Sequence, residues 1–175
     1  MVPGFAALLI LRELGAVVTA LLLTSRVGAG FAAEVGTMKI TEQIDALRML
    51  GIDPINYLVV PRLIACVVGT AILSIIANMT CLLLAMVVSD WLLSYSPAMF
   101  MASMRVFVSF QDIIFATIKA AVFGAVIPLV ACHMGFSCRS GADGVGRATT
   151  NAVVISSVFI IILDFVMTYG FSYFY

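Results

Sequence analysis

The chain has 175 residues, of which 63% are apolar and only 10% are charged, and its formal net charge is zero. Soluble domains carry about 25% charged residues, so this composition excludes an ordinary soluble protein. Balanced charge and a single histidine also leave no basic surface for nucleic acid. We therefore expect an integral membrane protein.

The first predicted span covers residues 5–33 and is interrupted by charged side chains. Arg12 and Glu13 lie within its apolar run, and Arg26 and Glu34 follow nearer its second end. A charge inside a span costs roughly 2.5–3.5 kcal/mol on insertion scales, so we expect each charged side chain to have a compensating partner or a function. We interpret Arg26 and Glu34 as structural. Arg12 and Glu13 are candidates for a polar site.

The segment 41–50, directly after this span, predicts a short helix. Thr41 can cap its N-terminus, and Glu42 suits the positive end of a helix. Gly51 is placed to end the helix, and Pro54 prevents its continuation. A helix of about ten residues is marginal alone in water, so it needs a docking surface on this chain or on another protein. An ordinary polar loop with a helical turn remains the alternative.

Three further apolar runs predict spans at residues 62–89, 113–136 and 149–174. A spanning helix needs about 20 residues, and these runs lack the strict alternation of a barrel strand. Residues 90–111 form a connection with room for a short surface helix. The expected fold is thus an all-α integral membrane protein, with four transmembrane helices and one short helix in a single domain, 1–175.

Basic residues in the connections predict the orientation. Two connections, 36–62 and 138–147, together hold five basic residues, whereas 90–111 holds only Arg105. This bias places the first two connections in the cytoplasm, or its topological equivalent, and puts 90–111 and both chain ends on the opposite side. An N-terminus on that side without a signal sequence suggests a missing upstream span.

Two more charges, Lys119 and Asp164, are embedded in the third and fourth predicted spans. If the helices form a bundle, these residues could lie at the same depth as Arg12 and Glu13. One interpretation is a polar cavity for the head group of an amphiphilic substrate. The other is ion pairing that only holds the bundle together, and the residues alone leave both open.

No motif for catalysis or cofactor binding is found along the chain. The glycine-rich segment 141–150 lacks the G-K-[ST] ending of a phosphate loop and opens an apolar helix. There is no H-E-x-x-H and no G-x-S-x-G, and the four cysteines form no C-x-x-C pair. We expect no enzymatic activity, no cofactor and no metal site in this chain.

Several segments, taken together and in order, resemble the MlaE/YrbE permease family, the membrane subunits of MCE-associated lipid transporters. They are R-E-L-G at 12–15, S-R-V-G-A-G-F-A-A-E-V-G-T-M at 25–38, T-E-Q-I-D-A-L at 41–47, G-I-D-P at 51–54, Y-L-V-V-P-R at 57–62 and G-A-D-G-V-G-R-A-T-T-N-A-V-V at 141–154. The resemblance covers nearly the whole chain. It departs at the start, where the family's N-terminal interfacial helix and first span have no counterpart. Ala16 also replaces the family's usual proline.

The resemblance implies the permease subunit of an ABC transporter that moves phospholipid or related lipid between the membrane and an MCE-protein channel. The implied partners are a second permease copy in a homodimer, a cytoplasmic ATPase that binds the ATP, and the MCE protein. The implied location is the bacterial inner membrane or the plastid inner envelope. An ion-coupled secondary transporter or channel subunit, or a structural scaffold, remains the alternative. Lipid identity and transport direction stay open.

The resemblance also assigns residues. By motif, the lipid-binding side chains are Arg12 and Glu13, joined by Lys119 and Asp164. Segment 41–50 becomes the coupling helix that docks on the ATPase, with its candidate contacts at Thr41, Glu42, Asp45 and Arg48.

Overall fold

The computed structural model describes residues 2–139 and 141–174, so positions 1, 140 and 175 of the predicted domain lie outside the described residues. The described residues form helices and no strand. Four helices are long and apolar enough to cross a membrane: Gly4–Ile40, Pro54–Leu92, Phe110–Phe136 and Gly141–Tyr173. The predicted all-α fold with four long apolar helices is confirmed.

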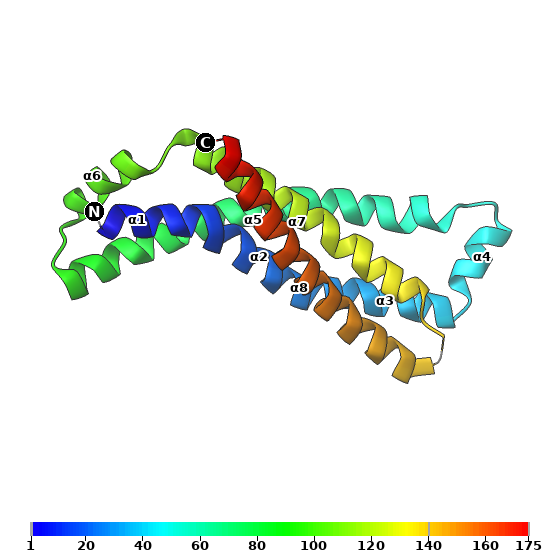
Figure 1. The fold of residues 1–175 in the computed structure, drawn as a ribbon. Helices are drawn as coiled ribbons and strands as arrows, with labels where there is room; N and C mark the ends of the chain where they lie inside the picture. Colours follow the sequence, from blue (N-terminus) through cyan, green and yellow to red (C-terminus); the bar gives the residue numbers. More distant parts are fainter. Residues whose placement is uncertain (1, 140, 175) are drawn as a thin grey trace.

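The four long helices form one elongated bundle (Figure 1). At one end the short helix α4 (Gln43–Met49) joins α3 (Ala29–Ile40) to α5, and at the other end lies α6 (Pro97–Phe107). The second long helix, α5 (Pro54–Leu93), begins earlier than the predicted span because Asp53 caps it and accepts a hydrogen bond from the backbone N–H of Ile55 at 3.1 Å. It packs along α7 (Phe110–Phe136), which in turn packs against α8 (Gly141–Phe174).

The first long helix is not a regular α-helix. Its three α-helical parts are α1 (Val2–Leu9), α2 (Gly15–Leu23) and α3 (Ala29–Ile40), and π-helical turns at Ile10–Leu14 and Thr24–Gly28 join them. A π-helical turn holds more residues than an α-helical turn, so it rotates the side chains that follow, and such turns often occur at functional sites. The first of them contains Arg12 and Glu13.

Helix α4 (Gln43–Met49) lies within the predicted coupling segment, but it begins differently. The prediction that Thr41 caps it is wrong: helix α3 continues to Ile40, and the Thr41 hydroxyl donates back to the carbonyl of Thr37 at 2.9 Å. Glu42 precedes α4 with a φ of 58° and makes no side-chain capping bond.

The predicted end of this helix is confirmed, because Gly51 follows with a φ of +75°, a conformation that glycine adopts without strain. The backbone N–H groups of Gly51 and Ile52 donate to the carbonyls of Arg48 and Leu47. This pair of backbone hydrogen bonds is the Schellman motif. Ile44 anchors α4 on the bundle, buried against Val35 and Leu58.

The connection between α5 and α7 contains the short helix expected for residues 90–111. Helix α6 runs Pro97–Phe107, and the Ser96 side chain caps it by accepting from the backbone N–H of Met99 at 3.4 Å. It lies against α1. Helix α7 then begins with a capping box, in which Ser109 and Asp112 each accept from the other's backbone N–H.

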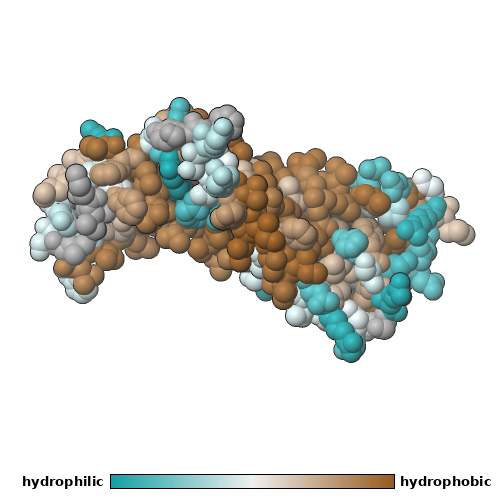
Figure 2. Space-filling model, viewed as in Figure 1, coloured by the Kyte–Doolittle hydropathy of each residue, from teal (hydrophilic) through white to brown (hydrophobic). Residues whose placement is uncertain are grey.

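Large apolar side chains remain exposed along α5 and α8, as expected for helices that face lipid acyl chains rather than water. Figure 2 shows this apolar surface over the middle of the molecule, whereas hydrophilic residues gather at the end that holds α4. In the buried interior, by contrast, three small side chains, Ala16, Ala20 and Ala120, pack around the larger Phe123 and Ile160.

Close packing between α5 and α7 leads to a first prediction. A Cβ atom at Gly124 would overlap the Thr70 hydroxyl and lie 2.8 Å from the backbone carbonyl oxygen of Cys66. We therefore expect Gly124→Ala to lower the free energy of unfolding by about 1–3 kcal/mol, measured by denaturation in detergent. The matched control is Gly69→Ala on α5, where a Cβ meets nothing within 4 Å. Equal stability of the two variants would contradict this packing.

Candidate functional site

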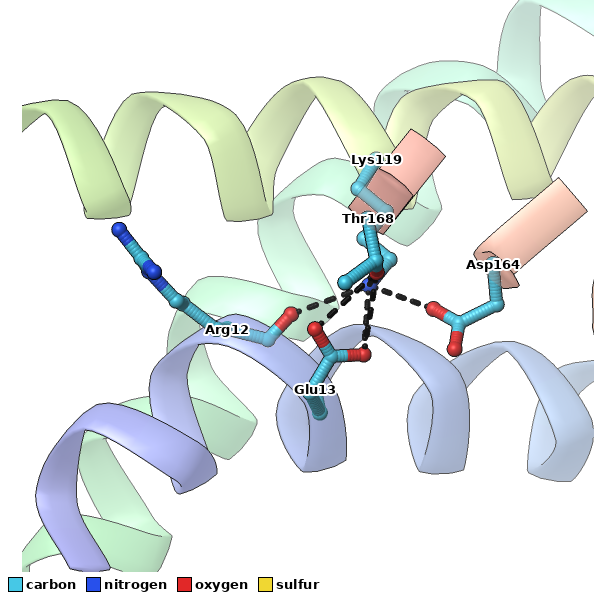
Figure 3. Close-up of polar contacts among 5 residues, drawn as sticks. All are labelled: Arg12, Glu13, Lys119, Asp164 and Thr168. Atoms are coloured by element: carbon cyan, nitrogen blue, oxygen red, sulfur yellow. Dashed lines mark hydrogen bonds and ion pairs between the residues drawn. The ribbon is translucent and has the colours of Figure 1, made fainter. Parts of the chain in front are cut away.

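Lys119 on α7 is the centre of a buried polar cluster, and its side chain is 0% exposed. Its ammonium donates to Glu13 Oε2 at 2.8 Å, to Thr168 Oγ1 at 2.9 Å and to the backbone carbonyl of Arg12 at 3.2 Å (Figure 3). An ammonium has three N–H donors, so these bonds use all of them. The contacts connect three long helices at one depth.

Asp164 on α8 is the second carboxylate of the cluster. Its Oδ1 atom is buried and lies 2.5 Å from Lys119 Nζ as an ion pair. Thr168 stands one helical turn after Asp164 and donates to Glu13 Oε1 at 3.1 Å. We call these four residues, Glu13, Lys119, Asp164 and Thr168, the Lys119 cluster.

Arg12 contributes its backbone to this cluster, but its side chain points away from Lys119 (Figure 3). The guanidinium instead pairs with Asp112, whose side chain is 2% exposed, at 2.6 Å. It also lies 4.9 Å from the ring centroid of Phe171, a favourable cation–π geometry. Asp112 in turn accepts from the backbone N–H of Ser109 at 2.8 Å, so the ion pair is tied to the start of α7.

The structure thus brings three of the sequence-predicted lipid-site side chains together, those of Glu13, Lys119 and Asp164, whereas Arg12 contacts them only through its backbone. Two further side chains at the site, those of Asp112 and Thr168, were not predicted. Asp112 lies just before the third predicted span, and Thr168 lies within the fourth. The only signal for Thr168 was its spacing of four from Asp164, which puts both on one helix face. Neighbouring positions along the first helix explain the division of partners, since Glu13 faces α7 and α8 while Arg12 faces the start of α7.

A cavity of about 220 Å³ opens beside the cluster. Its polar lining comes from Arg12, Glu13, Thr168 and Ser172, and its apolar lining from Leu8, Leu9, Phe115 and Phe171. The side chains of Arg12 and Glu13 are 25% and 31% exposed, while Lys119 is inaccessible. A molecule that enters the cavity therefore meets the Glu13 carboxylate and the Arg12 guanidinium at its polar end.

The predicted coupling residues lie far from this cluster, at the α4 end of the bundle. Asp45 accepts ion-pair contacts from Lys39 at 3.3 Å and from Arg48 at 3.4 Å. Thr41 and Glu42 are exposed at the start of the helix. Two apolar side chains that were not predicted, Met49 and Leu50, are 90% and 74% exposed at its end.

Of the charges interpreted as structural, Glu34 forms an ion pair with Arg62 on α5 at 2.7 Å. The Arg62 guanidinium also lies 5.5 Å from the ring centroid of Phe31, so this pair ties α3 to α5. Arg26 is exposed on the second π-helical turn. No contact within the described residues supports a structural role for Arg26.

Comparison with known proteins finds relatives in bacteria and in a plant, and the bacterial ones are named as ABC transporter permeases. A probable ABC transporter permease from Synechocystis is 41% identical over 168 residues, 96% of this chain and 64% of that protein. One from Rickettsia typhi is 41% identical over 157 residues, 90% of this chain and 61% of its own length. An Arabidopsis thaliana chloroplastic protein, named trigalactosyldiacylglycerol 1, is 41% identical over 167 residues, 95% of this chain and 48% of that protein.

The chain spans 61–64% of the length of these two bacterial relatives. The family model of permease MlaE matches residues 1–169, which is almost the whole chain. The chain therefore belongs to the MlaE permease family of ABC transporters.

Proposed function

We propose that this permease moves phospholipid or a related lipid between the membrane and an MCE-protein channel, driven by a separate ATPase. The observation that carries the proposal is the Lys119 cluster with its adjoining cavity, a polar site enclosed by helices whose outer faces are apolar. Family membership supports it, as does the lipid name carried by the Arabidopsis relative.

An amphiphile fits the two kinds of lining that the cavity offers. Its head group would lie at the polar end beside Arg12 and Glu13, and the start of its acyl chains would lie against Leu8 and Phe115. Ion pairs inside the bundle give both cations, Arg12 and Lys119, a carboxylate partner, which lowers the cost of placing them in the membrane when no lipid is bound. Lys119 and Asp164 would then serve to orient Glu13.

The proposed assembly is a homodimer of permeases with ATPase subunits on the cytoplasmic side and the MCE protein on the opposite side. Helix α4 would dock on the ATPase, because it lies outside the long apolar helices on the side that the basic connections place in the cytoplasm. The ATP would be bound by the partner, with no cofactor in this chain. The membrane would be the bacterial inner membrane or the plastid inner envelope.

The decisive experiment is lipid movement by the full-length permease, co-purified with its ATPase and reconstituted in vesicles. We expect Glu13→Ala to reduce ATP-dependent lipid movement to background while the complex still assembles, since Glu13 is partly exposed to the cavity. Asp143→Ala is the control, because Asp143 forms an exposed pair with Arg147 near the start of α8. Ion-driven transport without an ATPase, or full transport by Glu13→Ala, would refute the proposal.

A further inference from the structure

We infer that the cavity beside the Lys119 cluster selects a zwitterionic lipid head group that carries a primary ammonium, in preference to an anionic head group. The inference rests on the proposed function, because it takes a lipid to be the ligand. It goes further by naming the chemistry of the head group and the side chain that recognises it.

Lys119, the obvious partner for a lipid phosphate, cannot serve as one. Its side chain is 0% exposed, and its three N–H donors are taken by Glu13, Thr168 and the backbone of Arg12. Asp164 lies against it as well, at 2.5 Å. A phosphate would have to displace one of these buried acceptors, which would leave that acceptor without its partner.

The charges around the cavity also disfavour an added anion. Two cations, Arg12 and Lys119, face three carboxylates, Glu13, Asp112 and Asp164. The carboxylates around the cavity therefore outnumber the cations. An anionic head group would add a further negative charge beside Glu13, in a region of low dielectric constant where like charges repel strongly. A zwitterion adds no net charge and can set each of its charges beside an opposite one.

The groups that the cavity does present match a zwitterion. Glu13 is 31% exposed, and its Oε1 atom accepts one hydrogen bond, from Thr168. A carboxylate oxygen has two lone-pair sites, so Oε1 can accept another bond from an ammonium N–H. Arg12 lines the same cavity with 25% of its side chain exposed, next to Ser172. The ammonium would bind Glu13, and the phosphate would lie beside Arg12.

The test uses the full-length permease with its ATPase in vesicles of equal parts phosphatidylethanolamine, phosphatidylcholine and phosphatidylglycerol. One of the three at a time is photoactivatable on its acyl chain, and labelling of the peptides around Glu13 and Phe171 is measured. We expect phosphatidylethanolamine to label about tenfold more than phosphatidylglycerol, as a charge-assisted hydrogen bond predicts. It should also exceed phosphatidylcholine, which has the same net charge but no N–H group.

Glu13→Gln should remove this preference, because the amide keeps the shape and a carbonyl acceptor but loses the charge. Asp143→Asn, exposed near the start of α8, is the matched control and should keep the preference. Equal labelling by phosphatidylcholine and phosphatidylethanolamine, stronger labelling by phosphatidylglycerol, or a preserved preference in Glu13→Gln would overturn the inference. Labelling by all three lipids alike would leave the proposed function standing, whereas no labelling near Glu13 would refute both.

Discussion

Lys119→Ala is expected to lower the free energy of unfolding by about 3–5 kcal/mol, the usual cost of removing one partner from a buried ion pair. Lys119 is fully buried and holds Glu13 from the first helix together with Asp164 and Thr168 from α8. Without it, two carboxylates would face each other with no cation between them. Denaturation of the purified permease in detergent would measure the loss, and lipid movement should stop.

Lys39→Ala is the matched control, since Lys39 pairs with Asp45 at 3.3 Å where both side chains are partly exposed. An exposed pair contributes about 0–1 kcal/mol, so this variant should be almost as stable as the parent. A triple variant with Lys119→Met, Glu13→Gln and Asp164→Asn should regain most of the stability and yet remain inactive. If Lys119→Ala is no less stable than Lys39→Ala, the cluster does not hold the helices together.

Met49→Asp combined with Leu50→Asp is expected to weaken ATPase binding at least about 30-fold, because hot-spot side chains contribute about 2 kcal/mol or more to an interface. Both side chains project from the end of α4 and are 90% and 74% exposed, on the hydrophilic end of the bundle rather than among the long apolar helices. Ile44 and the Schellman motif fix the helix on the bundle, so it presents these residues rigidly.

The affinity of the permease for its ATPase can be measured by titrating the ATPase onto the full-length permease in detergent. Met99→Asp with Val106→Asp on α6 introduces the same charges at the opposite end of the bundle and should leave ATPase affinity unchanged. Asp45→Ala with Arg48→Ala tests the sequence-predicted contacts and should weaken binding or uncouple ATP hydrolysis from lipid movement. Unchanged affinity in both α4 variants would exclude α4 from the interface.

The long helices and the end of α4 could be predicted because their causes are local. Runs of about 20 or more apolar residues are sufficient to predict a spanning helix whatever surrounds them. Gly51 likewise ends α4 through its own backbone freedom, with a φ of +75°. The cost of burying charge also made Arg12, Glu13, Lys119 and Asp164 recognisable as candidates before their partners were known.

Which charges pair was decided only by the tertiary structure. Arg12 and Asp112 are 100 residues apart, and Glu13 and Thr168 are 155 apart, so their contacts depend on how the helices pack and rotate. The π-helical turn at Ile10–Leu14 also makes the pairing of Arg12 and Glu13 hard to predict from sequence. It rotates their side chains away from the directions that a regular α-helical period would give. Thr41 shows the same dependence on a small scale: its hydroxyl can cap the next helix or bond to the previous one, and the continuation of α3 to Ile40 selects the second.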